Sequence, residues 1–447
     1  MAVSARTDLT EGSVSARLIR YAVPIMAASI LQSLYGVADM LIVSRFLGSA
    51  GASAVSNSGQ ITRIVTQIAI GIATGGGILA GQYFGNKDKE NLEYAIGSFF
   101  TLFAGIGTVS TVVFFVCSRF FLSALKAPAP EESLAYLQIC SCGFLFVFGY
   151  NALAAILRAV GNSGKPLHFI IASTVTNVVL DMIFIGVFKW GTAGAAAATV
   201  AAQALSFGLA LHYLTRQKEI FSFEKKYFKM QAGKVLIILK LGIPCAVQMS
   251  IAGLSWLTVT RLVNDYGVAL SAANGISTKI KDFSMQLISS LTTGAAAMIA
   301  QNLGASLYDR AKKTLYSAMR IALLTSVITV IVVEIFAPQL VALFISDPEV
   351  SGPAVLNLRI EIVSQLFYAI FLIYHSLMIG AGHTLCVLFS SFVNCVLVRI
   401  PLSIFMNGLW GPVGIFIACA IAPVSSVPVG FIYEKLGRWK TSIAAKT

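Results

Sequence analysis

The stretch YAVPIMAASILQSLYGVADMLIVS, residues 21–44, decides the fold and lies between Arg20 and Arg45. It is apolar almost throughout. A helix that rises about 1.5 Å per residue over this length crosses a hydrocarbon layer of about 30 Å. The stretch therefore predicts a transmembrane helix near the start of the chain.

One acidic residue, Asp39, lies inside this expected helix. On insertion scales a carboxylate in the middle of a span costs about 2.5–3.5 kcal/mol. Gln32, Tyr35 and Gly36 precede it by seven, four and three residues, so they share its helix face. A structural acid held by a neighbouring helix is the alternative, but intramembrane acids are usually functional. Pro24 removes one hydrogen bond of the helix and allows it to bend, so we expect Asp39 to act as a switch.

The composition is that of a membrane protein along the whole chain. Of the 447 residues, 57% are hydrophobic and only 11% are charged, which excludes an ordinary soluble domain. The seven cysteines are odd in number and include no CxxC pair, and the four histidines lack metal-ligand spacing. We therefore expect neither a disulfide framework nor a metal site. The glycines 75–77 are not followed by Lys-Ser or Lys-Thr, so we expect close helix packing there and no use of ATP.

Apolar runs long enough to span a membrane follow one another along the chain. The first is too long for a signal-peptide core, so we expect it to be retained. The run from Ile362 to Val398 has no Asp, Glu, Lys or Arg and exceeds one span, so we divide it at residues 380–383. No segment shows the alternation of a membrane barrel, so an all-α fold is expected. The twelve expected spans are 20–44, 52–84, 94–118, 133–157, 166–189, 191–214, 236–262, 270–302, 318–345, 355–380, 384–408 and 411–433.

The distribution of Lys and Arg predicts the orientation in the membrane. Alternate connections are rich in basic residues, which indicates that both termini are cytoplasmic and that Lys126 and Lys189 lie outside. The net charge of +13 is then mostly loop charge, so nucleic-acid binding is not expected. The connection 216–234 separates an expected N-lobe, 1–215, from a C-lobe, 235–447, with six spans each. The cytoplasmic set includes Arg17, Arg20, Lys87, Lys89, Arg158, Lys165, Lys225, Arg310, Lys312 and Lys435.

The two halves repeat each other. Thr74-Gly75 recurs as Thr293-Gly294, and the repeat also matches Pro24 with Pro244 and Asn177 with Asn394. Halves of six spans enter the membrane in the same direction, so their pseudo-axis is expected along the membrane normal, with a substrate cavity between the lobes. The acids Asp39 and Asp181 have no acidic counterparts in the second half. Packing alone does not require that asymmetry.

The fifth and sixth expected spans carry further polar residues. Thr174, Asn177 and Asp181 share a helix face, and Thr199 and Gln203 form an i, i+4 pair. Two carboxylates that approached each other would disfavour double ionisation and so favour a shared proton. Hydrogen bonding between helices is the alternative for these polar residues, above all for Thr199 and Gln203.

The second half carries charged and adaptable side chains. Arg399 needs a partner, for which Glu361 is one candidate. Lys279, Lys281 and Asp282 are expected to form a solvated helix end rather than the mouth of a cavity. Met249, Met285 and Phe283 are typical of an adaptable apolar pocket, although packing is the commoner role of any one of them.

Together these residues resemble the multidrug and toxic compound extrusion (MATE) family, in particular its DinF-like branch. The resemblance covers essentially the whole chain and is carried by Pro24, Gln32, Asp39, Asn177, Asp181 and Thr199, with the two-lobe repeat. It implies a V-shaped pair of six-helix bundles that export organic, often cationic compounds in exchange for H⁺ or Na⁺. It also implies that Asp39, Asn177, Asp181 and Thr199 form a cation-coupling network and that the first helix bends near Pro24.

These inferences predict a monomeric antiporter of the cytoplasmic membrane that exchanges lipophilic cations for H⁺, with Na⁺ as the alternative ion. Its tentative substrate-binding residues are Gln32, Tyr35, Asp39, Met249 and Met285. The main rival is a flippase for a lipid-linked sugar or peptidoglycan precursor. A membrane-embedded enzyme is disfavoured because the sequence shows no nucleophile–base set and no metal spacing.

Overall fold

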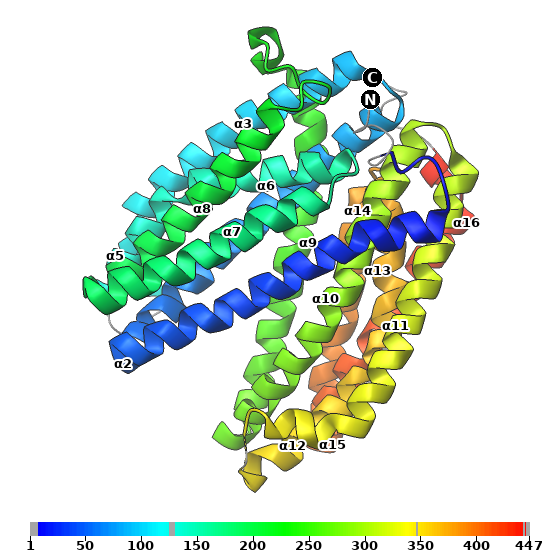
Figure 1. The fold of residues 1–447 in the computed structure, drawn as a ribbon. Coiled ribbons are helices and arrows are strands. Elements are labelled where there is room, and N and C mark those ends of the chain that lie inside the picture. The colour runs from blue at the N-terminus through cyan, green and yellow to red at the C-terminus, as the bar shows by residue number, and fades with distance from the viewer. Residues whose placement is uncertain (1–7, 125–129, 346, 441–442, 444–447) are drawn as a thin grey trace. The chain divides into compact units, whose positions relative to one another are not determined.

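The computed structural model describes residues 8–124, 130–345, 347–440 and 443. Lys126, which we expected outside the cell, lies outside these described residues. All regular secondary structure in the described part of the chain is helical, so the expected all-α fold is confirmed (Figure 1).

The first half consists of long helices joined by short connections (Figure 1). Gly48, with φ 65°, interrupts α2 and divides it into two spans. The elements of the first half are α2 (Val14–Gly85), α3 (Lys89–Val116), α4 (Ser118–Ala124), α5 (Pro130–Cys142), α6 (Phe144–Ala159), α7 (Gly164–Asp181), the π-helix η1 (Met182–Val187) and α8 (Gly191–Thr215).

The second half repeats this plan after the short 3₁₀-helix η2 (Lys225–Phe228). Non-helical backbone at Trp410 and Gly411 interrupts α15. The elements of the second half are α9 (Ala232–Asn264), α10 (Val268–Gly304), α11 (Tyr308–Ala342), α12 (Pro348–Ile362), α13 (Ser364–Gly380), α14 (Thr384–Phe392), the π-helix η3 (Val393–Arg399), α15 (Ile400–Ile421), η4 (Ala422–Ser426), α16 (Val427–Lys435) and η5 (Arg438–Lys440).

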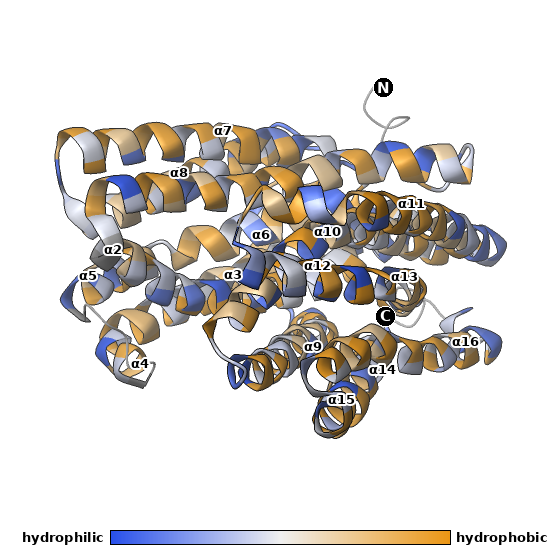
Figure 2. Ribbon diagram, turned by 90° about the horizontal axis from the view of Figure 1, so that it is seen from below, coloured by the Kyte–Doolittle hydropathy of each residue, from blue (hydrophilic) through white to orange (hydrophobic). Residues whose placement is uncertain are grey.

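The described residues contain nine helical segments long and apolar enough to span a membrane, and two bent helix pairs bring the total to eleven. One of the nine, Thr384–Lys435, has 52 residues. At about 1.5 Å per residue this length exceeds twice the hydrocarbon thickness, so the break at Gly411 separates two spans and gives the twelve expected. Hydrophobic residues predominate along helices such as α7 and α11 (Figure 2).

Both repeats contain a π-helical turn in the corresponding span, although the two turns are not in the same register. In the first half η1 follows directly after Asp181, and in the second half η3 ends at Arg399. Asn177 and Asn394, which the sequence repeat pairs, lie just before η1 and within η3 respectively. Single π-turns inside α-helices occur frequently at functional sites.

The chain divides into two compact units that do not coincide with its two halves. Within the described residues, the first unit contains Asp8 and the chain from Ala27 to Ala246, and the second contains Leu9–Met26 and the chain from Val247 onward. Helices α2 and α9 therefore each pass from one unit to the other, directly after Pro24 and Pro244 respectively. A proline inside a helix removes one backbone hydrogen bond, so both crossings follow a weakened turn.

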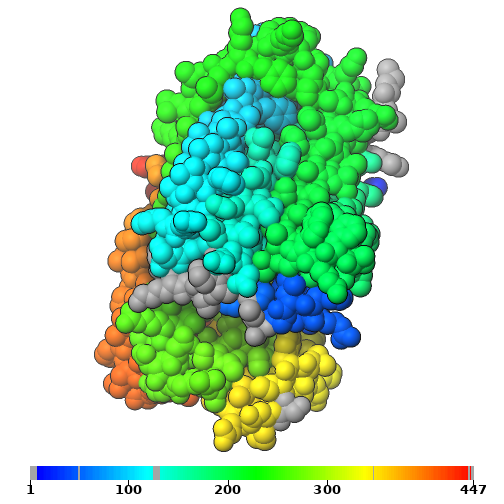
Figure 3. Space-filling view, turned by 90° about the vertical axis from the view of Figure 1, so that its left-hand side faces the viewer, coloured from blue at the N-terminus to red at the C-terminus, as the bar shows by residue number. Residues whose placement is uncertain are grey.

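The first unit is held together by close approaches of small residues. A Cβ atom on Gly75 would lie 2.4 Å from the Ile238 carbonyl oxygen, so only glycine allows α2 and α9 to pack this closely. This confirms the packing role expected for Gly75, and Gly76 packs closely on the Phe99 ring, while Gly77 makes only ordinary contact with Ala155. Helices α7 and α8 pack together, and α8 packs on α5. Figure 3 shows the cyan surface of α3 and its neighbours beside the green surface of α7 and α8.

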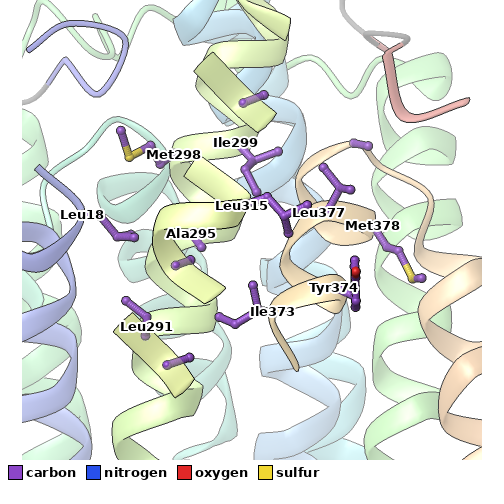
Figure 4. Close-up of a cluster of buried hydrophobic side chains, with 14 of the residues drawn as sticks. Leu18, Leu291, Ala295, Met298, Ile299, Leu315, Ile373, Tyr374, Leu377 and Met378 are labelled. Carbon is purple, nitrogen blue, oxygen red and sulfur yellow. The ribbon is translucent and has the colours of Figure 1, made fainter. Parts of the chain in front are cut away.

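The core of the second unit lies between α10, α11 and α13, with the N-terminal part of α2 packed on it. Figure 4 shows Leu18 of α2 and Leu291, Ile299, Leu315 and Ile373 within this cluster. All five side chains are 6% exposed or less. Burial of one such side chain is worth about 1.5–3 kcal/mol, so this part of α2 is firmly anchored in the second unit.

Candidate functional site

Two carboxyl groups meet inside the first unit. Asp39 of α2 and Asp181 of α7 lie within hydrogen-bonding contact of each other, and Asp181 is fully buried. The Oδ1 atoms of both residues are buried and face no donor. Because ionised carboxylates only accept hydrogen bonds, this contact requires a proton or a cation between the two groups.

Asn177 connects this pair to helix α8. In the amide orientation that satisfies both neighbours, Asn177 Nδ2 donates to Asp181 Oδ2 at 2.8 Å. The backbone nitrogen of Thr199 donates to Asn177 Oδ1 at 3.2 Å. Asn177 is 1% exposed, so the amide fixes the position of the Asp181 carboxyl.

Hydroxyl groups extend the network beyond the residues that sequence reasoning placed there. The side chain of Thr199 contacts the hydroxyls of both Tyr35 and Tyr136, and Cys140 contacts Tyr136. Tyr136 and Cys140 of α5 were missed as members of the network. The signal that would have found Tyr136 is a tyrosine hydroxyl inside an apolar run, because a buried hydroxyl usually needs a partner.

The local helix geometry explains why these side chains meet. After Asp181 the backbone switches to π-helical pairing, with Phe188 N donating to Ile183 O at 2.8 Å. The wider turn changes the rotation of the residues that follow, and Gly186 then lies against the Phe46 ring of α2. This contact between α2 and η1, which directly follows α7, lies beside the meeting point of Asp39 and Asp181.

Other polar residues singled out in the sequence lie apart from the carboxyl pair. Gln32 is exposed on α2, and Gln203 lies against Gly143 at the break between α5 and α6. Thr174 is half-buried on α7. Of the tentative substrate residues in the second unit, Met249 of α9 and Met285 of α10 are both half-buried.

The second unit contains a buried charged cluster that corrects one expectation. The solvated helix end expected at residues 279–282 is wrong for Lys281, which is 5% exposed and forms an ion pair with Glu361. Lys279 and Asp282 are exposed as expected. The error arose because the sequence alone does not show that Lys281 lies opposite an acid of α12, which satisfies its charge inside the unit.

Arg399, the other candidate of the second half, lies in the same cluster. Its Nη2 donates to the Tyr368 hydroxyl, and Glu361 lies nearby but is paired with Lys281. Among the residues that the structure describes, no three His, Cys, Asp or Glu side chains gather to hold a metal ion.

The sequence profile of the MatE family matches residues 24–183 and 244–405, one match in each repeat. The chain belongs to the MATE family of membrane transporters. It is similar to the "Probable multidrug resistance protein YpnP" of Bacillus subtilis, with 28% identity over 97% of each chain. It is also similar to the "Multidrug export protein MepA" of Staphylococcus saprophyticus, with 24% identity over 92% of this chain and 91% of that one.

Solved structures of MATE transporters share this fold. A structure described as the outward-facing conformation of a multidrug resistance MATE family transporter matches with a TM-score of 0.91 over 99% of both chains. Its sequence identity is 20%, so the likeness concerns the fold. The all-α MATE fold expected from the sequence is thereby confirmed, and the chain is a multi-pass membrane transporter.

Proposed function

We propose that this MATE transporter exports organic, often cationic and lipophilic compounds in exchange for protons. The observation that carries the proposal is the contact between the Asp39 and Asp181 carboxyls, with a buried oxygen on each that faces no donor. The names of the similar proteins, which refer to multidrug resistance and export, support this class of cargo.

The carboxyl pair suits an exchange of cargo for protons. When ionised, Asp39 and Asp181 place negative charge inside an apolar helix bundle and attract a lipophilic cation. A proton taken up by the pair removes that attraction and favours release. A ligand shifts such an equilibrium only through its difference in affinity for the two states, and here that difference is electrostatic.

Asn177 favours H⁺ over Na⁺ as the coupling ion. A sodium site needs several oxygen ligands, and Asp39, Asn177, Asp181 and Thr199 all carry oxygen. The Asn177 amide, however, presents its N–H group to Asp181, and its oxygen already accepts from the Thr199 backbone. Only the carboxyls and hydroxyls then remain as ligands, which suits a proton better than a metal ion.

Pro24 is proposed as the hinge that couples protonation to alternating access. It lies in the same helix as Asp39, two residues before α2 passes from the second unit to the first. The segment before it is anchored by Leu18 in the second unit. Bending at this turn would change the exposure of Asp39 and of its neighbours Gln32 and Tyr35 to the two sides of the membrane.

The remaining features of the proposal follow from the sequence. Met249 and Met285 are proposed to supply adaptable apolar contacts to the cargo. We place the protein in the cytoplasmic membrane as a monomer, with both termini inside, and assign it to the DinF-like branch. The distribution of basic residues supports this orientation.

The test is transport by proteoliposomes under an imposed pH gradient, with Na⁺ omitted and then supplied alone. The proposal expects efflux of a lipophilic cation that follows the pH gradient and ignores the Na⁺ gradient. Asp265→Asn, at an exposed acid of the second half, is the matched control for Asp39→Asn. Transport driven by Na⁺ and insensitive to pH would contradict proton coupling.

A flippase for a lipid-linked precursor is the competing function, and the buried cations Lys281 and Arg399 of the second unit are the observation that favours it. Binding experiments separate the two. If the protein exports cations, the purified protein should bind lipophilic cations and not undecaprenyl pyrophosphate lipids. If it is a flippase, the reverse should hold.

A further inference from the structure

The charged cluster of the second unit has one positive charge too many. Lys281, Arg399 and Glu361 are each 5% exposed or less, so two cations face one acid. Glu361 forms its ion pair with Lys281. The fourth buried charged side chain in the described part of this unit is Glu434, whose Oε1 accepts from the Tyr316 hydroxyl at 2.6 Å. The Arg399 guanidinium is therefore left without a carboxylate of its own.

The donors of Arg399 are only partly satisfied. Nη2 donates to Tyr368, but Nε and Nη1 are buried and have no acceptor. One helical turn later, the buried Ser403 hydroxyl contacts only the weakly polar sulfur of Cys419. The charges of Arg399, Glu361 and Lys281 act on Cys419, so the Ser403–Cys419 contact belongs to the same cluster.

The ring of Trp256 contacts both cations of this cluster. Lys281 Nζ is 4.0 Å from the Trp256 ring centroid, and the Arg399 guanidinium carbon is 4.6 Å from it. Cation–π contact lowers the cost of burying such charges but does not neutralise them. Water can satisfy an orphaned N–H group, but it does not balance a net charge inside hydrocarbon.

The corresponding spans of the two repeats differ in the charge of their buried side chains. In the first unit the residues around the π-helix, Asp181 with Asn177, present acceptors that need a positive partner. In the second unit the π-helix ends in Arg399 and contains Asn394. The corresponding span of the second unit thus carries a guanidinium with unpaired donors, where the first unit carries an acid.

We propose that the second unit binds a compact monovalent anion between Arg399, Ser403 and the Lys281–Glu361 pair, beside Trp256. The Arg399 fork supplies two charge-assisted hydrogen bonds, and Ser403 supplies a third donor. The shared chemistry fits a halide ion taken from solution or the carboxylate of a transported compound. The site is independent of the Asp39–Asp181 pair and of the coupling ion.

The experiment measures thermal unfolding of the purified full-length protein while chloride replaces isethionate at constant ionic strength. A ligand that binds only the folded state raises the melting temperature, and above its dissociation constant the rise follows the logarithm of the ligand concentration. Acetate in place of chloride tests the carboxylate source. A rise of this form with chloride assigns a halide, and a rise with acetate alone assigns a carboxylate. Equal melting temperatures in all three salts overturn the proposal.

Variants connect the effect to the site. Arg399→Gln should abolish the rise, while Arg359→Gln, at an exposed arginine paired with Glu334, should retain it. An unchanged rise in folded Arg399→Gln overturns the assignment. If Arg399→Gln does not fold, the variants Arg399→Lys and Glu361→Gln test whether the anion binds at this site. Arg399→Lys keeps the charge and should bind the anion more weakly. Glu361→Gln removes the competing acid and should bind the anion at least about tenfold more tightly. Affinities that do not move in these two directions overturn the proposal.

A second measurement uses the ring beside the site. Iodide bound there should quench the fluorescence of Trp256 with a saturable dependence on concentration. Trp256→Phe should remove this component and leave only the linear quenching of the other tryptophans. Purely linear quenching in the unsubstituted protein would contradict the proposal.

Discussion

The carboxyl of Asp181 contacts that of Asp39, and the amide of Asn177 holds it there from one helical turn away. The contact joins the first helix of the unit to the end of the fifth span, at the point where the backbone becomes π-helical. Two acids in this arrangement are able to share a proton, which neither could do alone. On the proposed function, this arrangement makes the two intramembrane acids one site for proton exchange.

Asp39→Asn should retain the fold and abolish coupled efflux, because Asn keeps the size of the side chain and loses the ability to titrate. Resistance of well-expressed cells and pH-driven transport in proteoliposomes measure the effect. Asp181→Asn should weaken coupling for the same reason. Wild-type resistance in Asp39→Asn cells would return the acid to a structural role, and an unchanged pH response in Asp181→Asn would remove it from the network.

The double variant Asp39→Asn/Asp181→Asn should transport no worse than the poorer single variant. Residues that act as one unit show strongly non-additive effects, because either substitution already destroys the shared site. Initial efflux rates of all three variants at equal protein density measure this. Losses that multiply would indicate two independent sites.

Lys281→Met should destabilise the second unit by about 3 kcal/mol, because removal of one partner leaves a buried charge without its pair. Lys279→Met is the matched control, since it removes an exposed lysine two residues earlier in the same helix. Thermal unfolding in detergent compares the two variants. Equal stability of both would show that Lys281 is not paired in solution.

Gly97→Ala should weaken the packing of the connection 216–234 against helix α3. A Cβ atom on Gly97 would lie 2.0 Å from the Tyr227 carbonyl oxygen, so one of the two segments must shift. Overpacking of this kind typically costs about 1–3 kcal/mol. Faster cleavage between residues 216 and 231 by a protease measures the effect, with Gly105→Ala as control, because a Cβ there meets no atom within 4 Å.

The distribution of basic residues predicts that position 225 lies in the cytoplasm and Lys189 outside. Cysteine introduced at 225 in a background without native cysteines should resist a membrane-impermeant thiol reagent added to intact cells, and cysteine at 189 should react. Labelling at 225 from outside would reverse the orientation.

Much of the fold could be predicted because hydrocarbon imposes a simple rule on sequence. Long apolar runs must be helices, and the division of the run from Ile362 to Val398 at residues 380–383 agrees with the end of α13 at Gly380. The passage of α2 and α9 between units could not be predicted, because it depends on which side chains each segment meets. Only the repeat of Pro24 as Pro244 hinted at it.

The candidate site was predictable in part for a similar reason. Asp39 and Asp181 stand out because charge in a membrane span is costly, and their spacing with Asn177 shows which residues share a face. Tyr136 was missed because tyrosine is common in apolar helices. The pairing of Lys281 with Glu361 was missed because it joins α10 to α12, and a single sequence does not give contacts between helices.

The central claim is that cargo and protons compete for the Asp39–Asp181 pair, and proton release on binding tests it most directly. Tetraphenylphosphonium is added to purified protein in weakly buffered detergent solution without Na⁺, and a pH indicator reports the protons set free. The account predicts release on binding, weaker binding as the pH falls, and loss of the release in Asp39→Asn. Binding without proton release, at an affinity that is independent of pH and reduced by Na⁺, would contradict it.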